Sequence, residues 1–103
     1  MGQSKESALE SYPQVASEYD KMRKLIRSMG PLTDREIELC MLSSFATKRD
    51  EASIKAWCTR ASKKGLSFQD AEHVILLLLG ATIGLSPTTD MLTWVKEEFS
   101  KYS

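Results

Sequence analysis

The sequence is poor in the residues that build metal and redox sites. Its 103 residues include one histidine, His73, and two cysteines, Cys40 and Cys58. Zinc sites draw mainly on Cys and His at short spacings, and no CxxC or HxxxH spacing occurs, so we expect neither a metal nor another cofactor. Two isolated cysteines do not make a disulfide framework, and they are typical of a reducing, cytoplasmic setting.

An excess of charge of one sign and a long hydrophobic run are also absent. Fourteen basic and fourteen acidic side chains give a formal net charge of zero, which argues against binding to nucleic acid or to an anionic membrane. The longest apolar run, Val74 to Leu79, is far shorter than the roughly 20 residues of a membrane span. No apolar segment of the signal-peptide kind is found near the N-terminus. We therefore expect a cytoplasmic protein with neither a nucleic-acid nor a membrane partner.

Helical periodicity fills most of the chain. Proline is scarce, and the alternation of β-branched residues that marks strands is missing. The sequence predicts an all-α, five-helix, bundle-like domain over residues 11–103, preceded by a flexible tail over residues 1–10. The predicted helices begin near Pro13, Thr33, Asp50, Phe68 and Ser86, and they end near Gly30, Ala46, Gly65, Ile83 and Tyr102.

Capping signals support three of these helix starts. Thr33 with Glu36, and Ser67 with Asp70, have the spacing of a capping box, in which each residue's side chain bonds the other's backbone amide. Asp50 is a favoured N-cap for the helix between them.

Two apolar segments indicate contacts beyond a small core. The first helix carries a stripe of Val15, Tyr19, Met22, Ile26 and Met29. Such a stripe indicates core or subunit packing, or a helix that binds a partner. The fourth helix is apolar on every side over residues 74–79, which indicates burial between subunits. We therefore expect a homo-oligomer.

A family resemblance rests on two segments in order, LTDREIELCMLSSFAT and RASKKGLSFQDAEHVILLLLGATIGLSP. Over roughly residues 32–87 they resemble the carboxymuconolactone decarboxylase and alkylhydroperoxidase D-like family. The resemblance implies an all-α domain of the alkylhydroperoxidase D-like type that assembles as trimers or hexamers. It also implies an antioxidant peroxidase or a lactone decarboxylase activity.

The residues that carry the family chemistry are replaced. Peroxidase-type members have a CxxC pair followed by a histidine, and these positions correspond here to Asp50, Ser53 and Trp57. Disulfide cycling needs two thiols, and proton transfer needs a titratable group, so none of the three can act as its counterpart. Glu38 corresponds to a proton-relay glutamate of the peroxidase branch.

Glu38 and His73 are the candidate catalytic residues. Glu38 borders the core stripe of its helix, where it is either solvated or buried with a raised pKa that suits an acid or base. His73 is either a packed residue at the core boundary or a substitute for the missing histidine. Ile54 and Trp57 are expected to line a pocket for a small organic ligand between the second, third and fourth helices.

Three further hypotheses remain open. Cys40 and Cys58 lie equally far on either side of the turn near residue 49, so they form a candidate redox pair or are inert core residues. The chain is alternatively a non-catalytic structural or interaction oligomer. The last alternative is binding of nucleic acid through the basic third helix. The neutral net charge argues against it, and so does the fourth helix, which is too apolar to lie in a groove of the nucleic acid.

Overall fold

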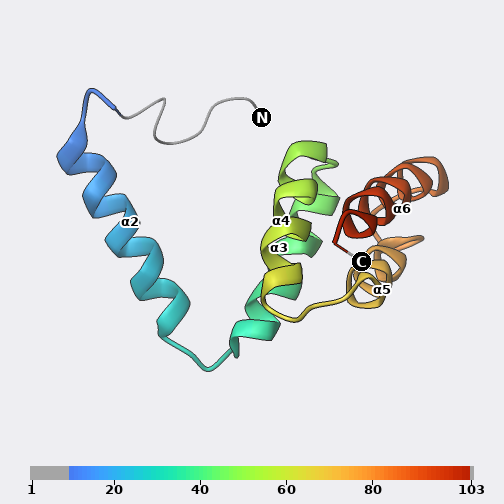
Figure 1. Ribbon diagram of the computed structural model, residues 1–103, viewed down its shortest axis with the longest axis horizontal. Helices are drawn as coiled ribbons and strands as arrows, with labels where there is room; N and C mark the ends of the chain where they lie inside the picture. Colours follow the sequence, from blue (N-terminus) through green and yellow to red (C-terminus); the bar gives the residue numbers. More distant parts are fainter. Residues whose placement is uncertain (1–9, 103) are drawn as a thin grey trace.

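Two helical hairpins form the body of the molecule (Figure 1). The structure is a computed structural model that describes residues 10–102. Its helices are α2 (Pro13–Ser28), α3 (Asp34–Thr47), α4 (Glu51–Lys63), α5 (Phe68–Leu78) and α6 (Leu85–Ser100). The α3–α4 hairpin packs on the α5–α6 hairpin through contacts of α3 with α5 and of α4 with α6. No strand occurs among the described residues, which confirms the all-α prediction, and the predicted flexible tail lies outside them except for residue 10.

The predicted caps fix where the helices begin. The Thr33 hydroxyl accepts a hydrogen bond from the Glu36 amide at 3.1 Å, and the Glu36 carboxylate accepts one from the Thr33 amide at 2.8 Å. Ser67 and Asp70 form the same reciprocal pair at the start of α5. The Asp50 carboxylate accepts a hydrogen bond from the Ser53 amide at 3.2 Å. All three capping predictions are confirmed.

The fourth helix is shorter than predicted, because it ends at Leu78 and not near Ile83. Gly80 adopts a left-handed φ of 82°, which only glycine takes at low cost. The Leu78 carbonyl then accepts hydrogen bonds from the amides of residues 81–83, each at 3.0 Å. This tight turn leads directly into α6.

The core lies between the two hairpins. Its fully buried side chains include Leu42, Ile54, Trp57, Cys58, Ile75, Met91 and Val95. Half-buried aromatic and aliphatic residues of α3, α5 and α6 surround them. Across residues 10–102, every helix falls short of the length or the apolar content that a bilayer-spanning helix needs.

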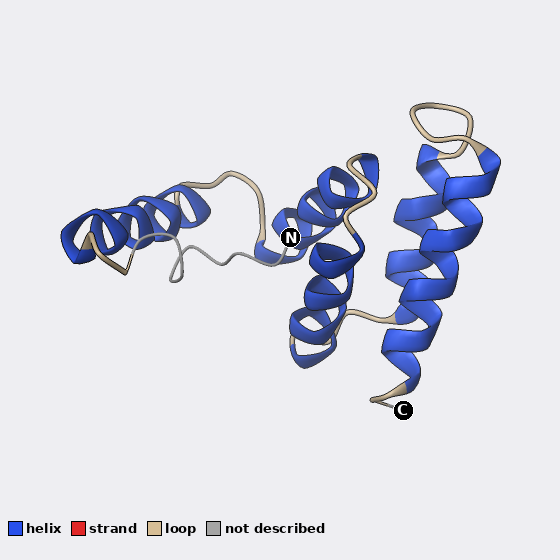
Figure 2. Ribbon diagram, turned by 90° about the horizontal axis from the view of Figure 1, so that it is seen from above, coloured by secondary structure: helices blue, strands red, loops and turns tan. Residues whose placement is uncertain are grey.

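Helix α2 stands apart from this body in both views (Figures 1 and 2). None of its residues is buried. Its apolar face, as we call it below, consists of Tyr12, Val15, Tyr19, Met22, Leu25, Ile26 and Met29, which are all exposed. The predicted stripe therefore covers no core within one chain. The other predicted apolar segment is also partly open, because Leu76, Leu77 and Leu79 are exposed.

Candidate functional site

A buried carboxylate lies where α2, α3 and α4 meet. α3 places Glu38 toward α4, and its side chain is only 1% exposed. Its Oε2 accepts a hydrogen bond from the Lys64 ammonium at 2.6 Å and another from the Arg27 guanidinium. Lys64 is the C-cap residue of α4, and Arg27 lies in the last turn of α2. One carboxylate thus ties three helices together.

The cations decide the ionisation state of Glu38. Burial opposes its charged form, but the hydrogen bond from Lys64 and the charges of Lys64, Arg27 and Arg60 outweigh that effect. The pKa of Glu38 is therefore held below its usual range, the reverse of what burial alone predicts. No group of the described residues donates a hydrogen bond to its second oxygen, Oε1. Glu38 is a fixed anion at neutral pH, which suits a structural ion pair better than proton transfer.

Trp57 of α4 forms a hydrogen bond with the backbone of Glu38. Its indole N–H donates a hydrogen bond to the backbone carbonyl of Glu38 at 2.7 Å. Both Trp57 and the neighbouring Ile54 are fully buried members of the core. The residue at the family's histidine position therefore joins α4 to α3, and both predicted pocket residues fill the core.

A cleft opens beside Glu38, between α2 and the α3–α4 hairpin. Its volume is about 480 Å³. We call it the Glu38 cleft, and its lining comprises Asp20, Arg23, Lys24, Arg27, Glu38, Met41, Phe45, Arg60 and Lys64. Five cationic side chains thus face two carboxylates over an apolar floor of Met41 and Phe45. The protein has no net charge, so this cleft concentrates positive charge and favours an anion.

His73 lies in a different hollow from Glu38. The α3–α5 groove, as we call it, has a volume of about 560 Å³. Its lining includes Arg35, Leu39, Cys40, Asp70, His73, Val74, Leu77 and Leu78. Arg35 and Asp70 form an ion pair across it. The structure therefore does not bring the two candidate catalytic residues to one cavity.

The two cysteines occupy different environments. Both are free; Cys40 is exposed, while Cys58 is buried in the core. Burial, followed by the negative charge of Glu98, raises the pKa of the Cys58 thiol to about 12. Because the thiolate is the reactive form, Cys58 is inert at neutral pH.

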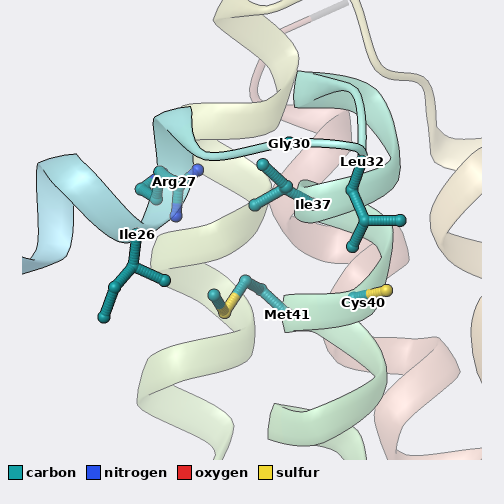
Figure 3. Close-up of a pocket in the computed structure, with 7 residues that line it drawn as sticks. All are labelled: Ile26, Arg27, Gly30, Leu32, Ile37, Cys40 and Met41. Carbon is teal, nitrogen blue, oxygen red and sulfur yellow. The ribbon is translucent and has the colours of Figure 1, made fainter.

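A third hollow lies where α2 joins α3 (Figure 3). Ile26, Leu32, Ile37 and Met41 make its lining largely apolar, and Arg27 also lines it. Figure 3 draws the Cys40 sulfur on the side of α3 away from Ile26. This hollow therefore adds an apolar patch beneath α2 and no reactive group.

The sequence did not reveal the cations around Glu38. Arg27 and Lys64 lie 11 and 26 residues away from it along the chain. The sequence shows only that the helices carrying Arg27 and Lys64 end in basic residues. Basic residues at a helix C-terminus also interact favourably with the helix dipole, so their presence does not indicate a buried ion pair.

Comparisons of the chain with protein-family models, with curated proteins and with solved structures find no match. The resemblance to the carboxymuconolactone decarboxylase and alkylhydroperoxidase D-like family therefore stays a prediction. Within residues 10–102, His, Cys, Asp and Glu form no group of three that could hold a metal ion.

Proposed function

We propose that this protein binds a small organic anion in the Glu38 cleft without transforming it. The chain would be a cytoplasmic homo-oligomer of the alkylhydroperoxidase D-like type, in which the family's reactive residues have been replaced. The observation that carries the proposal is the excess of cations in the cleft of a protein with no net charge. Its volume lies within the range of about 300–1,000 Å³ that is common for ligand sites.

The lining favours an acidic group attached to an apolar body. Within the described residues, Arg23, Lys24 and Arg60 form no ion pair, whereas Arg27 and Lys64 are held by Glu38. A guanidinium binds a carboxylate or phosphate through two parallel hydrogen bonds. Met41 and Phe45 offer half-buried apolar surface to the rest of the ligand. An aromatic or branched aliphatic carboxylate fits both requirements.

Three features support binding without catalysis. Asp50 is an N-cap and Trp57 a core hydrogen-bond donor, so two of the family's reactive positions have structural partners. Glu38 is ion-paired, with its pKa lowered. Cys58 is a buried thiol whose pKa is raised. Neither Glu38 nor Cys58 is thus suited to act as an acid, base or thiolate at neutral pH.

Titration with benzoate, followed by amide chemical shifts, tests the proposal. We expect shifts in α3 and α4 around Met41 and Arg60, and no binding of the neutral analogue benzamide. Arg60→Gln should weaken benzoate binding at least tenfold. Lys63→Gln removes the same charge from an exposed residue of the same helix turn and should leave binding unchanged. Equal binding of benzamide, or equal losses in both variants, would refute the site.

The family activities are tested separately. We expect the protein to show no turnover in assays of hydroperoxide reduction and of lactone decarboxylation. Turnover that Glu38→Gln or His73→Ala abolishes would overturn the non-catalytic assignment and restore the predicted catalytic residues.

A second candidate function is an interaction oligomer that binds no small ligand. The exposed apolar face of α2 favours it, because an apolar surface of that size usually meets a protein. Self-association of the protein without binding of benzoate would support this alternative.

A further inference from the structure

The apolar face of α2 is too large to remain in water. Its seven side chains expose between 38% and 69% of their surface. Together they present roughly 700 Å² of apolar surface, because a large side chain offers on the order of 150–200 Å² when fully exposed. The largest apolar patch of a typical monomer is about 300–600 Å². Something therefore covers this helix in the working protein.

The rest of the same chain does not cover it. At 100° per residue, the apolar face occupies a sector of about 140° of the helix, and Arg23, Arg27 and Lys24 lie in the remainder. This cationic side faces the Glu38 cleft. The ion pair of Arg27 with buried Glu38 fixes that orientation. Most of the apolar face is consequently left without a partner among the described residues of its own chain, and only Ile26 lines the hollow between α2 and α3.

The chain also has an apolar groove whose length matches part of the α2 face. The α3–α5 groove has an apolar floor of Leu39, Val74, Leu77 and Leu78, and Leu77 is 63% exposed. Its α3 wall, from Arg35 to Ser43, is about 12 Å long at 1.5 Å per residue. On α2, Tyr19, Met22 and Ile26 have the i, i+3, i+7 spacing of a helix that anchors in a groove, and they span about 10 Å.

We infer that the apolar face of α2 docks in the α3–α5 groove of a second copy of this chain, an inference that rests on the proposed self-association. Each α2 brings an apolar face of roughly 700 Å² to such a contact. In a reciprocal pair the two α2 faces together offer roughly 1,400 Å², which lies within the 1,200–2,000 Å² of a specific interface. The contact is reciprocal in a pair of copies, or runs head to tail around a closed ring.

A second copy explains more than the other occupants do. A foreign protein on α2 would leave the groove of this chain open. Pairing of two α2 helices with each other would also leave Leu77 and the groove floor in water. Only another copy brings the α2 face and the groove of this chain together in one contact.

Sedimentation of the full chain tests whether the apolar face of α2 mediates self-association. We expect an oligomer whose association Met22→Glu weakens at least tenfold. Ser17→Glu, at an exposed position on the opposite side of α2 and outside the Glu38 cleft, should leave association unchanged. Because α2 buries none of its residues, both variants should keep the helix content of the wild type by circular dichroism. A monomeric wild type would overturn this inference and the proposed oligomer together.

Crosslinking tests whether α2 of one copy lies in the α3–α5 groove of another. Cys40 lines the groove and is exposed, whereas Cys58 is buried. A short bis-maleimide should link the double variant Met22→Cys, Cys40→Ser to wild-type chains when the two are mixed, and mass spectrometry should identify residue 22 joined to Cys40. The double variant alone should not crosslink. A link between two residues 22 would indicate paired α2 helices, and an oligomer without the mixed link would indicate another surface. Either result overturns the docking and leaves self-association standing.

Discussion

Replacing Glu38 with glutamine tests whether the buried carboxylate holds three helices together. The substitution keeps the shape of the side chain and removes only its charge. Lys64 and Arg27 then face a neutral amide, and one of its two polar atoms is a nitrogen that cannot accept their hydrogen bonds. The backbone carbonyl that accepts the Trp57 indole N–H stays in place. Any change in stability therefore reports on the ion pairs.

Opposing effects set the size of the loss. A hydrogen bond to a charged group contributes about 1.5–3 kcal/mol, and Glu38 accepts two. However, the Arg27 and Lys64 side chains are 31% and 47% exposed, so water can solvate both cations once they are released. Removing the charge also relieves the cost of burying it. We expect Glu38→Gln to lower the free energy of unfolding by about 1–2 kcal/mol at pH 7.

The pH dependence of this loss identifies its cause. The pKa of Glu38 is lower in the folded protein than its ordinary value of about 4.3. A carboxylate of this kind stabilises the fold above its ordinary pKa, and its contribution is lost as the pH falls through the folded-state pKa. The difference between wild type and variant should therefore be full at pH 7 and shrink steadily below about pH 4.

Urea unfolding at several pH values measures both effects. The variant should have a lower midpoint and an unchanged dependence on urea concentration. Glu97→Gln removes a charge from an exposed position of α6 and should change stability by less than about 0.5 kcal/mol. A variant as stable as the wild type at pH 7, or a loss that stays constant down to pH 3, would refute the reasoning.

Three smaller predictions concern the core and one turn. Trp57→Phe removes a fully buried indole donor and should cost about 2–3 kcal/mol in thermal unfolding; a loss below about 0.5 kcal/mol would contradict that role. A chromogenic disulfide reagent at pH 8 should modify Cys40 rapidly and Cys58 only after unfolding, because the pKa of Cys58 is about 12; equal rates in the native protein would contradict its burial. Gly80→Ala should cost about 1–2 kcal/mol, since φ is 82° there, whereas Gly84→Ala, at a φ of −81°, should cost much less in the same assay.

The helix starts could be predicted from the sequence because their causes are local. Thr33 and Ser67 each form hydrogen bonds with the residue three positions further on, so a segment of four residues is enough to predict the cap. The end of α5 is local too. Gly80 lowers helix propensity, but the apolar run that precedes it favours a helix that continues to Ile83. The left-handed turn that Gly80 permits outweighed that propensity.

The environment of Glu38 could not be predicted in this way. Periodicity placed it beside the core stripe, which left both a solvated and a buried position open. Its two cations come from other helices, and their approach depends on how those helices pack. The same limit applies to α2, because an amphipathic pattern shows that a helix has an apolar face and not which surface covers it.

The cleft and the apolar face of α2 are two sides of one helix, and Glu38 fixes how that helix is turned. Its ion pair with Arg27 directs the cationic side of α2 toward α4, which completes the cleft. In the same orientation Tyr19 and Met22 stay exposed to solvent. An anion held between α2 and Arg60 would add contacts that exist only in this orientation, and it would therefore favour the surface that we assign to the second copy. Because linkage between two binding events is reciprocal, self-association would strengthen anion binding by the same factor.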